Sequence, residues 1–124
     1  MADFGKDKFA EGLERLGYEV EDKGSSRLAI KHTIGQGRFK GCEVLIGFEV
    51  PGDFELTPPS GPHISPRLLP INTGGADHHT RAHESPNFGD EWEYLSRPFP
   101  VGEWPRQRNV GSYLNYVIQL LETL

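Results

Sequence analysis

Proline is confined to one stretch of this chain of 124 residues, and this limits where regular structure can form. All ten prolines lie between Pro51 and Pro105, together with four of the five histidines and both tryptophans. Because proline cannot donate a hydrogen bond to a helix or a sheet ladder, we expect regular elements on either side of the stretch and mostly loop within it. Loops often carry function, so we expect the functional residues there.

The first 50 residues show the periodicity of one helix and three strands. Apolar residues recur at spacings of three and four over residues 6–16, and Gly17 follows where helices commonly end. Alternating runs then predict a hairpin over residues 18–34 and a third strand over residues 42–50. Cys42 falls on the apolar side of that third strand. We interpret it as a small buried residue rather than a nucleophile, because a buried thiol is poorly accessible.

Within the proline-rich stretch, the pattern supports only short strands. Prolines on both sides of His63 leave room for a short edge strand over residues 63–68, and residues 91–96 are the one further segment where a longer helix or strand can be argued. Asn109 or Ser112 is then expected to cap a C-terminal helix. The apolar stripe of that helix consists of Tyr113, Val117, Leu120, Leu121 and Leu124.

These patterns together predict one α+β domain over residues 1–124. The expected order is an N-terminal helix, a four-stranded antiparallel meander, an irregular proline-rich loop over residues 51–105 and a C-terminal helix. Such a long loop is unusual in a compact domain. Its aromatic residues favour a loop that is anchored to the domain, because disordered segments are usually poor in aromatic residues.

Composition and charge exclude several classes of function. The net charge of -5 and the scattered basic residues do not form the electrostatic footprint that nucleic acid requires. A single cysteine excludes an internal disulfide, and no apolar run is long enough to span a bilayer. We therefore expect a cytoplasmic protein that binds neither nucleic acid nor membrane.

The densest group of proton carriers and metal ligands lies over residues 77–84 and contains His78, His79 and His83. The spacing of His79 and His83 would suit a zinc site on one face of a helix, but the glycines and prolines around them do not favour a helix there. We therefore predict no metal and no cofactor, and treat the three histidines as catalytic candidates only if the protein is an enzyme. His32, on an apolar strand face, is expected to be a hydrogen-bonded core residue.

A second group combines large aromatic side chains with arginine, a composition typical of the anchors of protein interfaces. Packing of the long loop against the rest of the domain would use the same residues, and the sequence does not separate the two roles. The residues of this candidate partner-binding group are Trp92, Tyr94, Arg97 and Trp104.

The order of elements, with residues 50–54 and the prolines over residues 58–64, resembles the fold of ubiquitin-conjugating enzymes (E2). More narrowly, residues 70–75, the histidine group and residues 88–97 resemble a bacterial E2-like family. Members of that family are associated with genes for ubiquitin-like proteins, E1-like adenylating enzymes and JAB-type peptidases. The resemblance implies a bacterial ubiquitin-like conjugation system, with antiphage defence as a setting by association.

The chain departs from the catalytic E2 pattern at the residue that carries the chemistry. E2 enzymes place a histidine-proline-asparagine motif ahead of the cysteine that accepts the acyl group. Here residues 83–87 are an interrupted version of that motif, and residues 92–95 stand where the cysteine is expected. Because thioester transfer requires a thiolate, the resemblance implies a cysteine-less accessory or adaptor that binds a ubiquitin-like protein or its E1-like enzyme.

Two alternatives to an adaptor stay open. The first is an E2-like enzyme of unusual mechanism, in which His78, His79 or His83 serves as acid, base, acyl carrier or metal ligand. The second is a domain of the same fold whose partner is unrelated to ubiquitin. We favour the adaptor, because a histidine cluster alone lacks the positioned nucleophile that covalent transfer needs.

Overall fold

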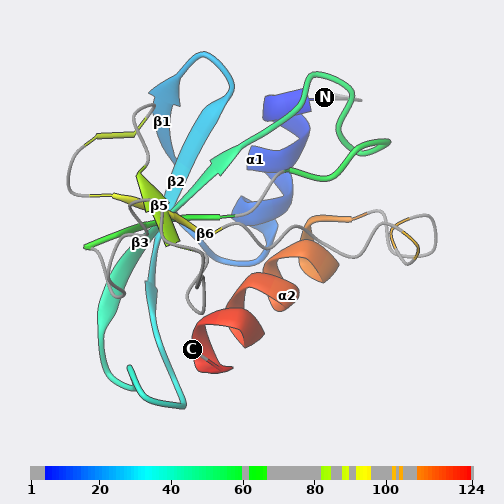
Figure 1. Cartoon of the computed structure of the whole chain (residues 1–124). Coiled ribbons are helices and arrows are strands. Elements are labelled where there is room, and N and C mark those ends of the chain that lie inside the picture. Colours follow the sequence, from blue (N-terminus) through cyan, green and yellow to red (C-terminus); the bar gives the residue numbers. More distant parts are fainter. Residues whose placement is uncertain are drawn as a thin grey trace.

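The structure of this protein is a computed structural model, which describes residues 5–59, 62–66, 82–84, 88–89, 92–95, 102, 104 and 109–123, with the backbone alone for residues 82–84. One antiparallel sheet and two helices make up an α+β fold (Figure 1). The elements are α1 Gly5–Arg15, β1 Glu21–Gly24, β2 Arg27–Thr33, β3 Glu43–Glu49, β4 His63–Ser65, β5 Ala82–Glu84, β6 Glu93–Leu95 and α2 Val110–Thr123. No helix in these ranges has the length and apolar character needed to cross a membrane.

The sheet contains six strands in the order β1-β2-β3-β4-β6-β5, so the predicted count of four is wrong. The first four strands do form the expected meander, but β6 pairs with β4 and β5 pairs with β6. This places β4 inside the sheet and not at its edge. Pro62 does not keep β4 at the edge, because it still contributes an acceptor: the amide of Leu95 donates to the Pro62 carbonyl over 2.9 Å.

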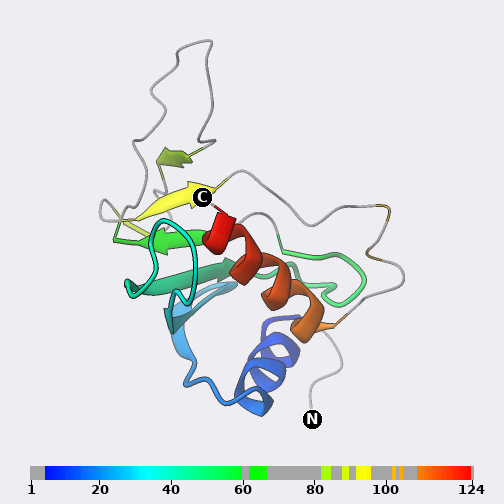
Figure 2. The ribbon, with the colours of Figure 1, turned by 90° about the horizontal axis from the view of Figure 1, so that it is seen from below.

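Both helices lie on the same side of the sheet, and the hydrophobic core fills the space between them and the strands (Figure 2). The alternation predicted for the third strand is confirmed, because Val44, Ile46 and Phe48 of β3 are buried in this core. The ring of Phe9 in α1 lies 4.9 Å from the ring of Phe48. We call the face of the sheet that these helices cover the inner face and the opposite one the outer face.

The helices approach each other closely where α2 begins. A Cβ atom placed on Gly12 of α1 would overlap Cγ2 of Val110, so only glycine fits at this contact. The amide of Ser112 donates to Oδ1 of Asn109 over 2.8 Å. Asn109 is therefore the N-cap of α2, one of the two caps that the sequence predicts.

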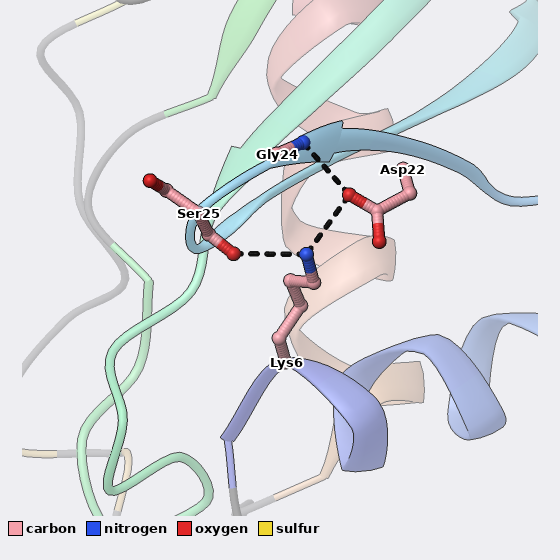
Figure 3. Close-up of polar contacts among 4 residues, drawn as sticks. All are labelled: Lys6, Asp22, Gly24 and Ser25. Carbon is pink, nitrogen blue, oxygen red and sulfur yellow. Dashed lines mark hydrogen bonds and ion pairs between the residues drawn. The ribbon is translucent and has the colours of Figure 1, made fainter.

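Lys6 links α1 to the hairpin of β1 and β2 (Figure 3). Its ammonium group donates to Oδ1 of Asp22 over 2.9 Å and to the carbonyl of Ser25 over 2.8 Å. The amide of Gly24 donates to the same Asp22 oxygen. These hydrogen bonds, with that of Lys6 the largest contribution, lower the pKa of the exposed Asp22 carboxyl.

The prediction that Cys42 is buried is wrong. Cys42 is exposed and precedes the first residue of β3, Glu43. Its amide donates to the carbonyl of Phe39 over 3.0 Å and its carbonyl accepts from the amide of Ile34 over 2.9 Å, so Cys42 joins the turn to the end of the ladder between β2 and β3. The apolar alternation of the sequence extends one residue beyond the strand.

Candidate functional site

Two of the three candidate histidines, His78 and His79, lie outside the described residues, as does Arg97. The backbone of His83 lies in β5, where it pairs with Tyr94 of β6. Among the residues that the structure does describe, no group of three or more His, Cys, Asp or Glu side chains could hold a metal ion. The chemistry assigned to the three histidines stays a prediction.

The register of the sheet aligns one residue from each of the six strands in a row. The row consists of Glu21, Ala29, Gly47, His63, Tyr94 and His83. It brings the His83 backbone into line with a second histidine, His63, with Tyr94 between them. His63 is not among the site residues that the sequence predicts. Its alternation with the core residue Ile64 is the signal that places it on the outer face.

His63 belongs to a cluster of rings on the outer face, which we call the aromatic stack: His63, Phe88, Trp92 and Tyr94. The His63 ring lies between those of Phe88, at 4.4 Å, and Tyr94, at 4.9 Å. The Trp92 ring lies 4.9 Å from that of Phe88, and Nζ of Lys23 lies 5.9 Å from the Trp92 ring. The stack therefore extends across the face from β1 to β6.

The aromatic stack contacts the sheet at Gly47. A Cβ atom at Gly47 would lie 2.6 Å from Cε1 of Phe88, which is closer than real Cβ contacts. The absence of a side chain at this central position of β3 lets the Phe88 ring rest directly on the strand. Phe88 can therefore reach His63, which pairs with Gly47 across β3 and β4.

The environment of His63 favours its neutral form. Its residue is 6% exposed, and burial together with the positive charge of Arg27 lowers the pKa of His63 to about 4. Burial is the larger cause, because an imidazolium ring loses its hydration inside the stack. His63 is thus a neutral imidazole near pH 7, buried between two aromatic rings.

His32 is hydrogen-bonded, as the sequence predicts, but it does not belong to the buried core. Its Nδ1 atom is hydrogen-bonded to the hydroxyl group of Tyr18 over 3.3 Å, and its side chain is half-buried. Burial lowers the pKa of His32, while the charge of Glu122 opposes that shift. We therefore assign His32 to the packing of β2.

The predicted partner-binding residues take part in packing where the structure describes them. Trp104 is 3% exposed, and its Nε1 donates to the carbonyls of Glu55 and Leu56 over 3.0 and 3.2 Å. Trp92 is 7% exposed within the aromatic stack, and Tyr94 is half-buried. Their contact with a partner stays a prediction, and packing is the role that the described contacts support.

Beside the aromatic stack, the surface over β1, β2 and β3 contains a hollow of about 430 Å³. Ala29 and Leu45 contribute apolar side chains on this face, whereas Val20 packs against the core, and charged residues form the rim. Its lining residues are Glu19, Val20, Glu21, Ala29, Ile30, Lys31 and Leu45. This combination of an apolar floor and a polar rim resembles the anatomy of protein interfaces.

Comparisons with protein-family models, with curated proteins and with solved structures find no match for this chain. The resemblance to E2 enzymes therefore rests on the residues quoted for it, and the activity of the protein has to be argued from its own geometry.

Proposed function

We propose that this protein is a cysteine-less, E2-like accessory or adaptor that binds a ubiquitin-like protein or its E1-like enzyme in a bacterial conjugation system. The observation that carries the proposal is the packing of residues 92–95 into the domain. The resemblance places the acceptor cysteine in this segment. Trp92, Glu93 and Leu95 are all buried there, and β6 pairs with strands on both sides. A segment packed in this way supports a structural role more than the presentation of a nucleophile.

The position of the only thiol supports the same proposal. Cys42 is exposed, but it precedes β3, whereas the segment in question lies beyond β4. Because a strand advances about 3.4 Å per residue, Cys42 lies roughly 17 Å along β3 from Gly47, which pairs with β4. An acyl group accepted by Cys42 would therefore be remote from β5 and β6.

The hollow on the outer face is the described surface best suited to a partner. Its floor offers apolar contact, and its rim offers both carboxylates and the ammonium group of Lys31. Lys31 is largely exposed and lies 3.9 Å from the carboxylate of Glu43. Because such a surface ion pair contributes little stability, Lys31 can leave Glu43 and contact a partner at little cost in free energy.

The second candidate, an enzyme that uses His78, His79 or His83, has one observation in its favour. The register places the backbone of His83 in the same row as Tyr94 and the buried His63. A substrate group bound at this end of the sheet would lie beside residues of β5 and β6. The same experiment tests both candidates.

The experiment combines the protein with ATP and with the E1-like enzyme and the ubiquitin-like protein that neighbouring genes encode. Adducts are then resolved on reducing and non-reducing gels, and complexes by size-exclusion chromatography. An adaptor yields a stable complex without an adduct. A thiol-sensitive adduct that disappears in Cys42→Ala would overturn the adaptor proposal, and an adduct lost only in the histidine variants would support the enzyme.

A matched pair of variants tests the hollow. Leu45→Glu places a charge on its floor, whereas Leu56→Glu makes the same change at a leucine that is 54% exposed in a loop outside the hollow. We expect Leu45→Glu to weaken complex formation at least about tenfold and Leu56→Glu to leave it unchanged. Equal affinities of the two variants would show that the partner binds elsewhere.

A further inference from the structure

The aromatic stack contains one group that can move without breaking the sheet. Tyr94 is held in β6, which pairs with β4 and β5. Phe88 lies outside the strands and covers the other side of the His63 ring at 4.4 Å. Trp92 packs on Phe88, and its amide donates to the carbonyl of Gly89 over 3.2 Å. Water can therefore reach His63 from this side only when the Phe88 ring moves away from Gly47 and His63.

The charges around His63 oppose a further positive charge. Arg27 of β2 acts on His63 directly, and Lys23 of β1 lies over the Trp92 ring on the far side of the stack. On this face, the register pairs Glu49 of β3 with Arg27, while Glu21 of β1 lies in the row of His63 and Glu43 of β3 lies beside Lys31. The faces of the two flanking rings attract a cation, but the loss of hydration on burial exceeds that attraction.

We infer that His63 is a proton-sensitive latch: its neutral ring holds Phe88 and Trp92 on the outer face of the sheet, and protonation releases them. The latch depends on the fit of Phe88 against Gly47 and on the sandwich of His63 between two rings. Release uncovers Gly47 and its neighbour Ala29, which already lines the hollow. The latch therefore controls how far the hollow extends across the sheet.

The direction of the pH effect follows from the two states of His63. In the released state His63 is hydrated and has its ordinary pKa of 6.5, whereas in the latched state the pKa is about 4. The released state thus binds the proton first, and the latch is fully closed above pH 6.5 and weakens as the pH falls towards 4. The difference between the two values predicts a rise of about 100-fold in the released population between pH 7 and pH 4.

Amide hydrogen exchange measured by NMR tests this inference. After correction for intrinsic exchange rates, the protection of the Trp92 amide is expected to fall by about 100-fold between pH 7 and pH 4. The amides of Leu28 and Ile46, which lie in the core strands β2 and β3, should keep their protection. Constant protection at Trp92, or a parallel loss at all three amides, would overturn the latch.

Three variants make the test specific to His63. His63→Phe keeps a ring in the stack but removes the proton, and Trp92 protection should then be independent of pH. Arg27→Met removes the nearby positive charge and so raises the pKa of His63 in the latched state, which should make the loss of Trp92 protection between pH 7 and pH 4 smaller; this variant decides the question if His63→Phe does not fold. Lys31→Met removes a largely exposed cation from the same strand and should leave the release unchanged. An Arg27→Met profile identical to that of Lys31→Met would also refute the latch.

Discussion

Substitution of Gly47 by alanine tests whether the aromatic stack sits directly on the sheet. The new Cβ atom would lie 2.6 Å from Cε1 and 2.9 Å from Cζ of Phe88. Since real Cβ contacts are not this short, either the Phe88 ring or the strand has to move. The ring is the more mobile of the two, because β3 is paired with β2 on one side and β4 on the other.

Two opposing effects set the magnitude of this change. Overpacking of a well-packed site lowers the free energy of unfolding by about 1–3 kcal/mol. Alanine is favoured over glycine within a strand by about 0.5–1 kcal/mol. We therefore expect Gly47→Ala to be less stable than the unsubstituted protein by about 0–2.5 kcal/mol, with about 1 kcal/mol at the midpoints of the two ranges.

Urea denaturation followed by far-UV circular dichroism measures this difference in a double-mutant cycle. In a Phe88→Ala background the clash is absent, so Gly47→Ala should be neutral or slightly stabilising, with a coupling of at least about 1 kcal/mol. Gly52→Ala is the matched control, because a Cβ atom there meets nothing within 4 Å. Additive effects of Gly47→Ala and Phe88→Ala would refute the direct contact between Phe88 and Gly47.

Two further substitutions test contacts of α1, both by the same denaturation assay. Gly12→Ala should lower the free energy of unfolding by about 1–2 kcal/mol through its clash with Val110, and Val110→Ala, which removes both γ carbons but keeps the Cβ at 2.7 Å, should relieve part of that loss; additive losses would contradict the close approach. Lys6→Met should cost about 1 kcal/mol, since it removes two hydrogen bonds to the hairpin. Lys8→Met removes a single contact of 3.6 Å and should cost less than about 0.5 kcal/mol, so equal losses would contradict the role of Lys6.

The elements with a clear local pattern could be predicted from the sequence. The helix expected over residues 6–16 is α1, Gly5–Arg15, and the expected cap Asn109 begins α2. The strand expected over residues 42–50 is β3, Glu43–Glu49. Cys42 was misplaced because hydrophobic alternation does not show where a turn ends and a strand begins.

The sheet beyond β3 could not be predicted in the same way. The strands β4, β5 and β6 contain three residues each, which is too short for a periodic pattern. Their pairings join segments that are far apart in the sequence, so no local pattern specifies the register. Of the candidate site, the sequence identified Trp92 and Tyr94 as anchors but did not bring them together with His63.

By itself, the sequence determined an α+β chain with two amphipathic helices, a meander and a proline-rich stretch without a cysteine. These properties follow from local periodicity, from caps and from the backbone chemistry of proline, which act over a few residues. Only the tertiary structure decided that β6 lies beside β4 and that Phe88 rests on Gly47. It also decided that His63 is neutral, because its pKa depends on the rings and the charge that distant segments place around it.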